Sequence, residues 1–171
     1  MQRIGLAVLT AAALAATQAA AQGNNDSMLL ELGANQMADA QRQHTQENID
    51  RATRALQAKD YATARRYAQS VSRADPKRVE AWLLLGAAQL GLEDWKKARI
   101  TYTTAVRLWP NNPEARAGLG VALARTNDPK ASVQLAWLTE KAAACGGCPQ
   151  YVKYKSDVET ALSAAAPPKG S

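Results

Sequence analysis

A repeat with a fixed spacing of 34 residues is the feature of this sequence that most restricts its fold. The clearest copy covers residues 79–112, and shifting it by 34 residues in either direction brings similar residues into register. The aligned columns are Ala52, Gly86 and Gly120; Asp60, Asp94 and Asp128; Ala64, Ala98 and Ser132; Ala68, Tyr102 and Ala136; Val71, Ala105 and Thr139; Pro76 and Pro110. A repeat of this length indicates supersecondary units that bury their apolar faces against neighbouring copies.

Each repeat is predicted to form two antiparallel helices. In residues 79–112, apolar residues follow helical spacing up to Leu90, residues 91–94 interrupt the pattern, and it resumes from Ala98 until Pro110. The aspartate column lies where each second helix should begin, and a carboxylate there can accept free backbone N–H groups. The chain has no phenylalanine and few other aromatic residues, which excludes an all-β fold. We therefore predict an all-α fold.

The middle repeat carries a recognisable pattern of residues. It reads W-x2-L-G…A-x3-Y-x2-A…P, on Trp82, Leu85, Gly86, Ala98, Tyr102, Ala105 and Pro110. This pattern resembles the tetratricopeptide repeat (TPR) family. The resemblance implies a right-handed α-solenoid of about three helix pairs over residues 45–148, with repeats at 45–78, 79–112 and 113–146. The outer repeats are more degenerate, since Arg51, Arg116 and Ala144 replace family residues.

The segments outside the repeats have different compositions. Residues 1–21 have the layout of a secretory signal peptide, with Arg3, an apolar stretch at 4–16 and small residues at Ala19 and Ala21. The apolar stretch is shorter than the roughly 20 residues of a membrane anchor. We expect residues 22–44 to be a leader with a partial helix at Met28–Met37. Residues 149–163 should form a capping helix, and residues 164–171 a disordered tail.

Cys145 and Cys148 are the two cysteines, separated by two glycines and followed by Pro149. In an oxidising compartment they are expected to form a disulfide. A structural clip in the turn before the capping helix is the favoured interpretation, because no strand pattern precedes the motif as it does in thioredoxin-like enzymes. A thiol-disulfide oxidoreductase that uses this motif is the alternative function. Pro149 stands where haem attachment would require histidine, and no further ligands are placed for zinc.

No other motif in the chain indicates catalysis. The single histidine, His44, lies in the leader, so no catalytic triad is expected, and no glycine-rich phosphate loop is present. We predict no catalytic residues, no metal site and no cofactor. The net charge of +6 is a modest bias that requires no nucleic-acid partner. The mature chain is expected to lack an integral membrane segment.

The resemblance also implies a binding surface, because the first helix of each TPR repeat lines the concave face. Carried over position by position, this groove consists of Ile49, Thr53, Leu56, Leu83, Ala87, Leu90, Ala117, Val121 and Ala124. These residues are small or apolar and lack the lysines and asparagines that clamp a peptide carboxylate. The groove suits an amphipathic helix or a hydrophobic peptide. The alternative is that the leader or the capping helix of this chain fills it.

Three further residues are candidates for an interface. Trp109 precedes the closing proline, where the family usually has a polar residue, and it serves either an interface or local packing. Arg65 and Arg66 belong to a basic segment that is either a solvated face or a docking patch for an acidic protein or anionic envelope polymer. We therefore expect a periplasmic or secreted, non-enzymatic adaptor for a protein or peptide, which works either alone or as a component of an envelope complex.

Overall fold

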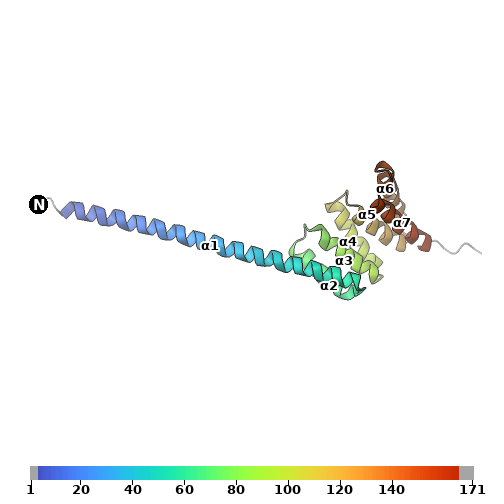
Figure 1. The fold of residues 1–171 in the computed structure, drawn as a ribbon, viewed down its shortest axis with the longest axis horizontal. Helices are drawn as coiled ribbons and strands as arrows, with labels where there is room; N and C mark the ends of the chain where they lie inside the picture. The colour runs from blue at the N-terminus through green and yellow to red at the C-terminus, as the bar shows by residue number, and fades with distance from the viewer. Residues whose placement is uncertain (1–3, 166–171) are drawn as a thin grey trace, which may run out of the picture. The chain divides into compact units, whose positions relative to one another are not determined.

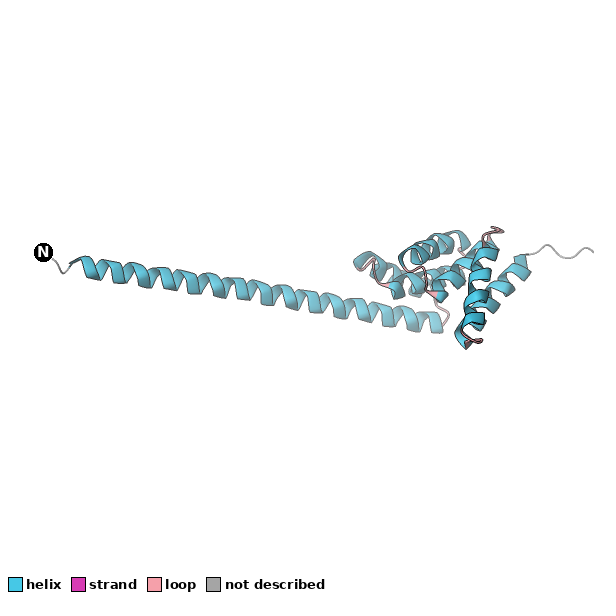
Figure 2. Cartoon of the chain, turned by 90° about the horizontal axis from the view of Figure 1, so that it is seen from above, coloured by secondary structure: helices cyan, strands magenta, loops and turns pink. Residues whose placement is uncertain are grey.

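A computed structural model describes the backbone of residues 4–165, together with the side chains of Met28 and residues 30–165. This part of the chain is helical and contains no strand, which confirms the predicted all-α fold (Figure 2). The helices, labelled in Figure 1, are α1 (Ile4–Gln57), α2 (Tyr61–Ala74), α3 (Val79–Gly91), α4 (Trp95–Leu108), α5 (Pro113–Arg125), α6 (Ala131–Ala144) and α7 (Pro149–Ala165).

The chain divides into two compact units, and the boundary lies between His44 and Thr45. In the first unit, α1 is helical through residues 22–44, so the expected partial helix at Met28–Met37 was too short. The physical reason is that no proline interrupts this segment. Nearly all its described side chains are exposed, including those of Met28, Leu30 and Met37. Among the described residues, no helix is both long and apolar enough to span a membrane.

The second unit stacks helices in two layers. Residues 45–57 of α1 pack on α2, and Ala52 of α1 shares a buried cluster with Ala68 of α2 and Leu85 of α3. Helices α3 and α5 contact each other directly, and α4 packs against both. Helices α6 and α7 complete the stack by packing on α5 and on each other. We call the side formed by residues 45–57, α3 and α5 the inner layer, and the side formed by α2, α4 and α6 the outer layer.

The turns inside the three helix pairs repeat with the same spacing as the sequence. Lys59, Glu93 and Asn127 all adopt positive φ angles of 52–58°. The amide of the following aspartate then donates to a carbonyl in the preceding helix, at 2.8–2.9 Å in all three turns. Each first helix therefore ends in the same left-handed turn, which returns the chain antiparallel to itself.

The aspartates at these turns cap the second helices in different ways. The Asp60 carboxylate accepts the Thr63 amide at 3.1 Å, as expected of an N-cap. The Asp94 carboxylate instead pairs with the Lys97 ammonium at 2.5 Å. Helix α6 begins at Ala131, so Asp128 precedes it by a full turn and accepts the Lys130 amide at 3.0 Å. The backbone amide of the aspartate thus closes the turn in all three copies. Its carboxylate makes the expected N-cap hydrogen bond in the first copy.

Residues at the C-terminal end extend α7 slightly beyond the expected capping helix. Ala164 and Ala165 belong to α7 rather than to a tail, because alanine continues a helix readily. The rest of the expected tail, residues 166–171, and residues 1–3 of the expected signal peptide lie outside the described residues.

Candidate peptide-binding groove

The expected groove residues occupy successive turns of residues 45–57, α3 and α5, so the inner layer presents them as three neighbouring rows. Their accessibility differs. Ile49, Ala117 and Ala124 are buried, whereas the other six are partly accessible: Thr53, Leu56, Leu83, Ala87, Leu90 and Val121. The accessible surface of the inner layer is therefore narrower than the nine positions expected from the sequence.

The row on α1 mixes core and surface residues. Ile49 packs in a buried cluster with Val71 and Ala81, so it joins α1 to α2 and α3. Thr53 donates its hydroxyl to the carbonyl of Ile49 at 2.9 Å, which leaves its methyl group as the apolar part of the surface. Leu56 packs partly against Ala55, Ala64 and Ala88. The row presents one large apolar side chain, that of Leu56.

The row on α3 is supported by Tyr102 from α4. Leu83 and Leu90 pack against the buried cluster that contains the Tyr102 ring, and the Tyr102 hydroxyl lies 3.5 Å from the Leu83 carbonyl. Gly86 and Gly118 leave the space that this ring fills, since a Cβ atom at either glycine would overlap it. Burial raises the pKa of Tyr102 far above its ordinary value. The leucines of α3 therefore rest on a rigid aromatic base.

The row on α5 is covered by α7. Ala117 lies in a buried cluster with Val158, and Val121 and Leu162 pack against that cluster. Ala124 shares another cluster with Ala161. Helix α7 thus occupies the part of the inner layer that α5 would otherwise expose, and Leu56, Leu83, Ala87 and Leu90 remain partly accessible.

A small pocket of about 170 Å³ lies where α7 meets the inner layer. Its lining contains both apolar and polar residues: Leu90, Tyr102, Glu114, Ala117, Gly118, Val121, Lys153, Tyr154 and Asp157. The Lys153 ammonium pairs with the Asp157 carboxylate at 2.8 Å. Burial raises the pKa of Glu114, and Lys153 partly opposes that rise. Charged groups therefore lie beside Leu90 and Val121 in this pocket.

This charged pocket was not expected from the sequence. Glu114, Lys153, Tyr154 and Asp157 belong to different helices, and only the packing of α7 on α5 brings them together. One signal in the sequence does indicate the ion pair: Lys153 and Asp157 are four residues apart on the same helix.

Cys145 and Cys148 are joined as a disulfide in the turn between α6 and α7, with their Cα atoms 5.7 Å apart. Cys145 is exposed and Cys148 half-buried. Gly146 and Gly147 supply the positive φ angles of 68° and 87° that the turn requires. The Gly147 amide donates to the Ala142 carbonyl at 2.8 Å, which ends α6. The cysteine pair therefore closes the turn that leads into α7.

The candidate interface residues lie apart from the inner layer. Arg66 is exposed, and its guanidinium lies 4.8 Å above the Tyr67 ring. Arg65 is half-buried between α2 and α4, beside Lys97 and Gln89. Trp109 is half-buried and caps α4 through its backbone amide, which donates to Ala105 at 2.8 Å. The structure does not bring these three residues together into one patch.

Titratable side chains do not form a metal or triad site in the part of the chain that the structure describes. His44 is exposed. Among the described residues, no group of three or more histidine, cysteine, aspartate or glutamate side chains is arranged to hold a metal ion.

Comparisons with known proteins identify the repeat family of this chain. A sequence model of the tetratricopeptide repeat matches residues 49–113 and 88–144. The cytochrome c-type biogenesis proteins CcmH of Escherichia coli (strain K12) and Shigella flexneri are each 38% identical to this chain over 55 residues. That segment is 32% of this chain and 16% of each relative, so the chain spans only a small part of their length.

A solved structure shows the same fold. The type III secretion translocator chaperone SycD of Yersinia enterocolitica superposes with a TM-score of 0.58 over 71% of this chain and 90% of its own. The sequence identity is 16%, so this likeness concerns the fold, a helical solenoid.

Proposed function

The chain belongs to the tetratricopeptide repeat family, and we propose that it is a non-enzymatic adaptor that holds a hydrophobic or amphipathic segment of a partner protein on its inner layer. The observation that carries this proposal is the accessible apolar strip formed by Leu56, Leu83, Ala87 and Leu90. These side chains are half-buried, and Tyr102 supports the two leucines of α3 from below. A preformed apolar surface of this kind binds with little reorganisation.

The spacing of the strip favours a helical ligand. Leu83, Ala87 and Leu90 recur at intervals of four and three residues, so they form one stripe about two turns long on α3. A partner helix with apolar residues at matching intervals could pack along it. The strip contains no lysine or asparagine to hold a terminal carboxylate, which argues against that mode of TPR binding.

Export is part of the same proposal. Residues 1–21 have the composition of a secretory signal, and the Cys145–Cys148 disulfide suits an oxidising compartment. The two CcmH relatives are named as cytochrome c-type biogenesis proteins. These names support a role in the biogenesis of a partner protein. We propose a periplasmic or secreted location on these grounds.

Site-specific photo-crosslinking in the native host tests the adaptor function. A photoreactive residue placed at Ala87 lies within the strip. The same residue at the exposed Val152 of α7 is the matched control. The proposal expects a discrete protein adduct from position 87 that is absent from position 152. Equal adducts at both positions, or none at position 87, would contradict it.

The cysteine pair supports a second candidate, a thiol-disulfide oxidoreductase. Cys145 is exposed, so a substrate thiolate could attack its sulfur. In the balanced exchange, two thiols of the substrate lose two electrons and two protons to form a disulfide, and Cys145 and Cys148 gain them to become thiols. Insulin reduction by the dithiol form tests this role. Turnover that is lost in the Cys145→Ser variant would favour the enzyme over the adaptor.

A further inference from the structure

A second surface lies on the outer layer, between α4 and α6. It is a cleft of about 610 Å³, and we call it the outer cleft. Its lining comes from α4, α5, α6 and the turn before α6: Arg99, Ile100, Thr103, Thr104, Arg107, Leu119, Leu123, Asp128, Lys130 and Gln134. The volume is within the range of ligand-binding pockets in proteins.

The packing of the helices explains why the outer cleft exists. Helices α4 and α6 make no direct backbone contact, although each packs against α5 between them. The floor is therefore made by α5, through Leu119 and Leu123, which lie one helical turn apart. Ile100 of α4 adds an apolar side chain at the rim, and 65% of its surface is exposed.

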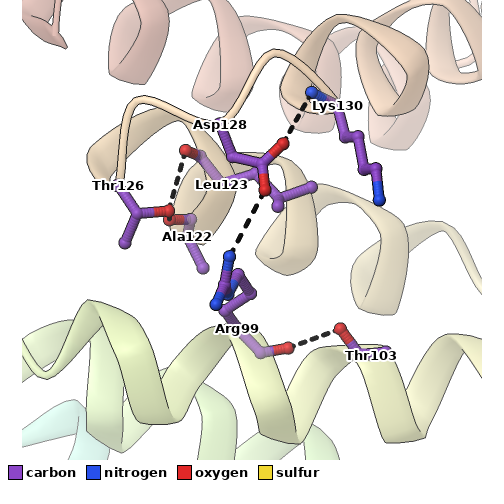
Figure 3. A network of polar contacts seen from close by, with 7 residues as sticks. All are labelled: Arg99, Thr103, Ala122, Leu123, Thr126, Asp128 and Lys130. Atoms are coloured by element: carbon purple, nitrogen blue, oxygen red, sulfur yellow. Dashed lines mark hydrogen bonds and ion pairs between the residues drawn. The ribbon is translucent and has the colours of Figure 1, made fainter.

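The rim of the outer cleft is positively charged. Arg99 and Arg107 lie two turns apart on α4, and Lys130 stands on the opposite side. The one acidic lining residue, Asp128, is already engaged, because its carboxylate accepts the Lys130 amide at 3.0 Å and pairs with the Arg99 guanidinium at 3.3 Å. Figure 3 shows Arg99 reaching from α4 to this carboxylate. The structure gives Arg107 no ion pair, so the cleft has an excess of positive charge.

The corresponding cleft one repeat earlier is different. It lies between α2 and α4, measures about 240 Å³, and is lined by Arg65, Gln69, Leu85, Gln89 and Lys97. Shifted by 34 residues, Gln89 corresponds to Leu123 and Arg66 to Ile100. The Gln89 side chain is 6% exposed, and its Oε1 atom has no hydrogen-bond partner in the structure. Of these two clefts, the outer cleft has a leucine where the earlier one has Gln89, and an apolar residue at the position of Arg66.

We propose that the outer cleft is a docking site for an acidic segment of a partner protein that inserts apolar side chains one helical turn apart. The leucine floor accepts the apolar side chains, and Arg107 and Lys130 attract the flanking carboxylates. Charge complementarity indicates this partner, because the basic side chains that line the cleft outnumber its acidic ones. The site is distinct from the inner layer, so the protein could hold two segments at once.

Binding of designed peptides to the full chain tests the proposal. Four fluorescent peptides of about 16 residues, about 24 Å long as helices, carry either glutamates or lysines on their flanks and either leucines or alanines at two positions four apart. The glutamate and leucine peptide should bind saturably, and each of the other three should bind at least about tenfold more weakly. Its affinity should fall as salt is added.

Variants of the chain then locate the site. Arg107→Glu should weaken binding of the glutamate and leucine peptide by about tenfold or more. Lys96→Glu is the control, because it makes the same charge change on an exposed residue of α4 outside the cleft. It should weaken binding by less than about twofold. Ile100→Arg installs the residue of the preceding repeat. It should weaken binding although it adds positive charge, which separates apolar docking from simple charge attraction.

Several results would overturn the proposal. They are equal binding of the alanine peptide, stronger binding by Ile100→Arg, equal losses in Arg107→Glu and Lys96→Glu, or no saturable binding of any peptide. Sedimentation of the full chain tests a second copy as the occupant. Self-association that Ile100→Arg abolishes, without peptide binding, would assign the cleft to a dimer and reject the acidic partner.

Discussion

The Tyr102 ring of α4 lies directly over Gly86 of α3, where a Cβ atom would come within 2.5 Å of the ring. Gly118 of α5 meets the same ring from the other side. One aromatic side chain thus sets the spacing of two inner-layer helices. Because the ring is rigid and buried, neither glycine can gain a side chain without moving a helix.

Gly86→Ala should therefore destabilise the protein. Overpacking of this kind typically costs about 1–3 kcal/mol, so the melting temperature should fall by several degrees. Gly33→Ala is the matched control, since a Cβ atom there meets nothing within 4 Å and alanine favours a helix. Thermal unfolding followed by circular dichroism measures both variants. An unchanged melting temperature for Gly86→Ala would show that the helices can separate freely.

The groove variant Leu83→Glu with Leu90→Glu should reduce capture of the partner that crosslinks at position 87. We expect a loss of tenfold or more, which corresponds to about 1.4 kcal/mol. Val152→Glu places one glutamate at an exposed position of α7 and should leave capture unchanged. Quantitative pull-down, with circular dichroism to verify folding, makes the comparison. Undiminished capture by a folded groove variant would move the binding site elsewhere.

Helix α7 should be essential to the solenoid. Val158 is fully buried against α5 and α6, so Val158→Asp should cost at least about 2 kcal/mol and expose Leu138 and its neighbours. A chain that ends at Cys148 should aggregate or melt early for the same reason. Val152→Asp alters an exposed position of the same helix and should have little effect. A soluble, fully helical chain without α7 would refute its capping role.

Replacing both cysteines with serine should leave the fold intact. The disulfide closes a loop of four residues, for which the chain-entropy model gives a stabilisation of about 2 kcal/mol, well below that of a long loop. The Gly147 amide would still end α6 through its bond to Ala142. Far-UV circular dichroism and a melting curve test this expectation. Loss of helicity at room temperature would assign the disulfide a larger role.

Glu114 should make the protein less stable as pH rises. Burial raises its pKa above the ordinary value of 4.5, so the folded state binds the proton more tightly than the unfolded state. The stabilisation is present below pH 4.5 and is lost as pH rises through the folded pKa. Glu114→Gln should therefore match the wild type near about pH 4 and exceed its stability near about pH 7.

Urea unfolding at the two pH values measures this difference. Glu140→Gln removes an exposed carboxylate elsewhere in the chain and serves as the control for the loss of one negative charge. A wild-type protein that gains stability relative to Glu114→Gln toward neutral pH would reverse the sign of the prediction.

The sequence by itself determined the local architecture of the repeats. Residues 34 apart make the same left-handed turns at Lys59, Glu93 and Asn127, because backbone hydrogen bonds within a few residues specify each turn. The apolar spacing and the absence of strand patterns were equally local signals. The all-α fold, with its stacked helix pairs, was predictable for that reason.

Tertiary structure decided which surfaces remain accessible. Ala117 and Ala124 have the spacing of groove residues, yet α7 covers them from the far end of the chain. The outer cleft likewise depends on Arg99 of α4 meeting Asp128 in the turn before α6, a pairing between two separate repeats. Burial and ion pairing between separate helices depend on how the helices are arranged in space. The spacing of residues along one helix does not determine that arrangement.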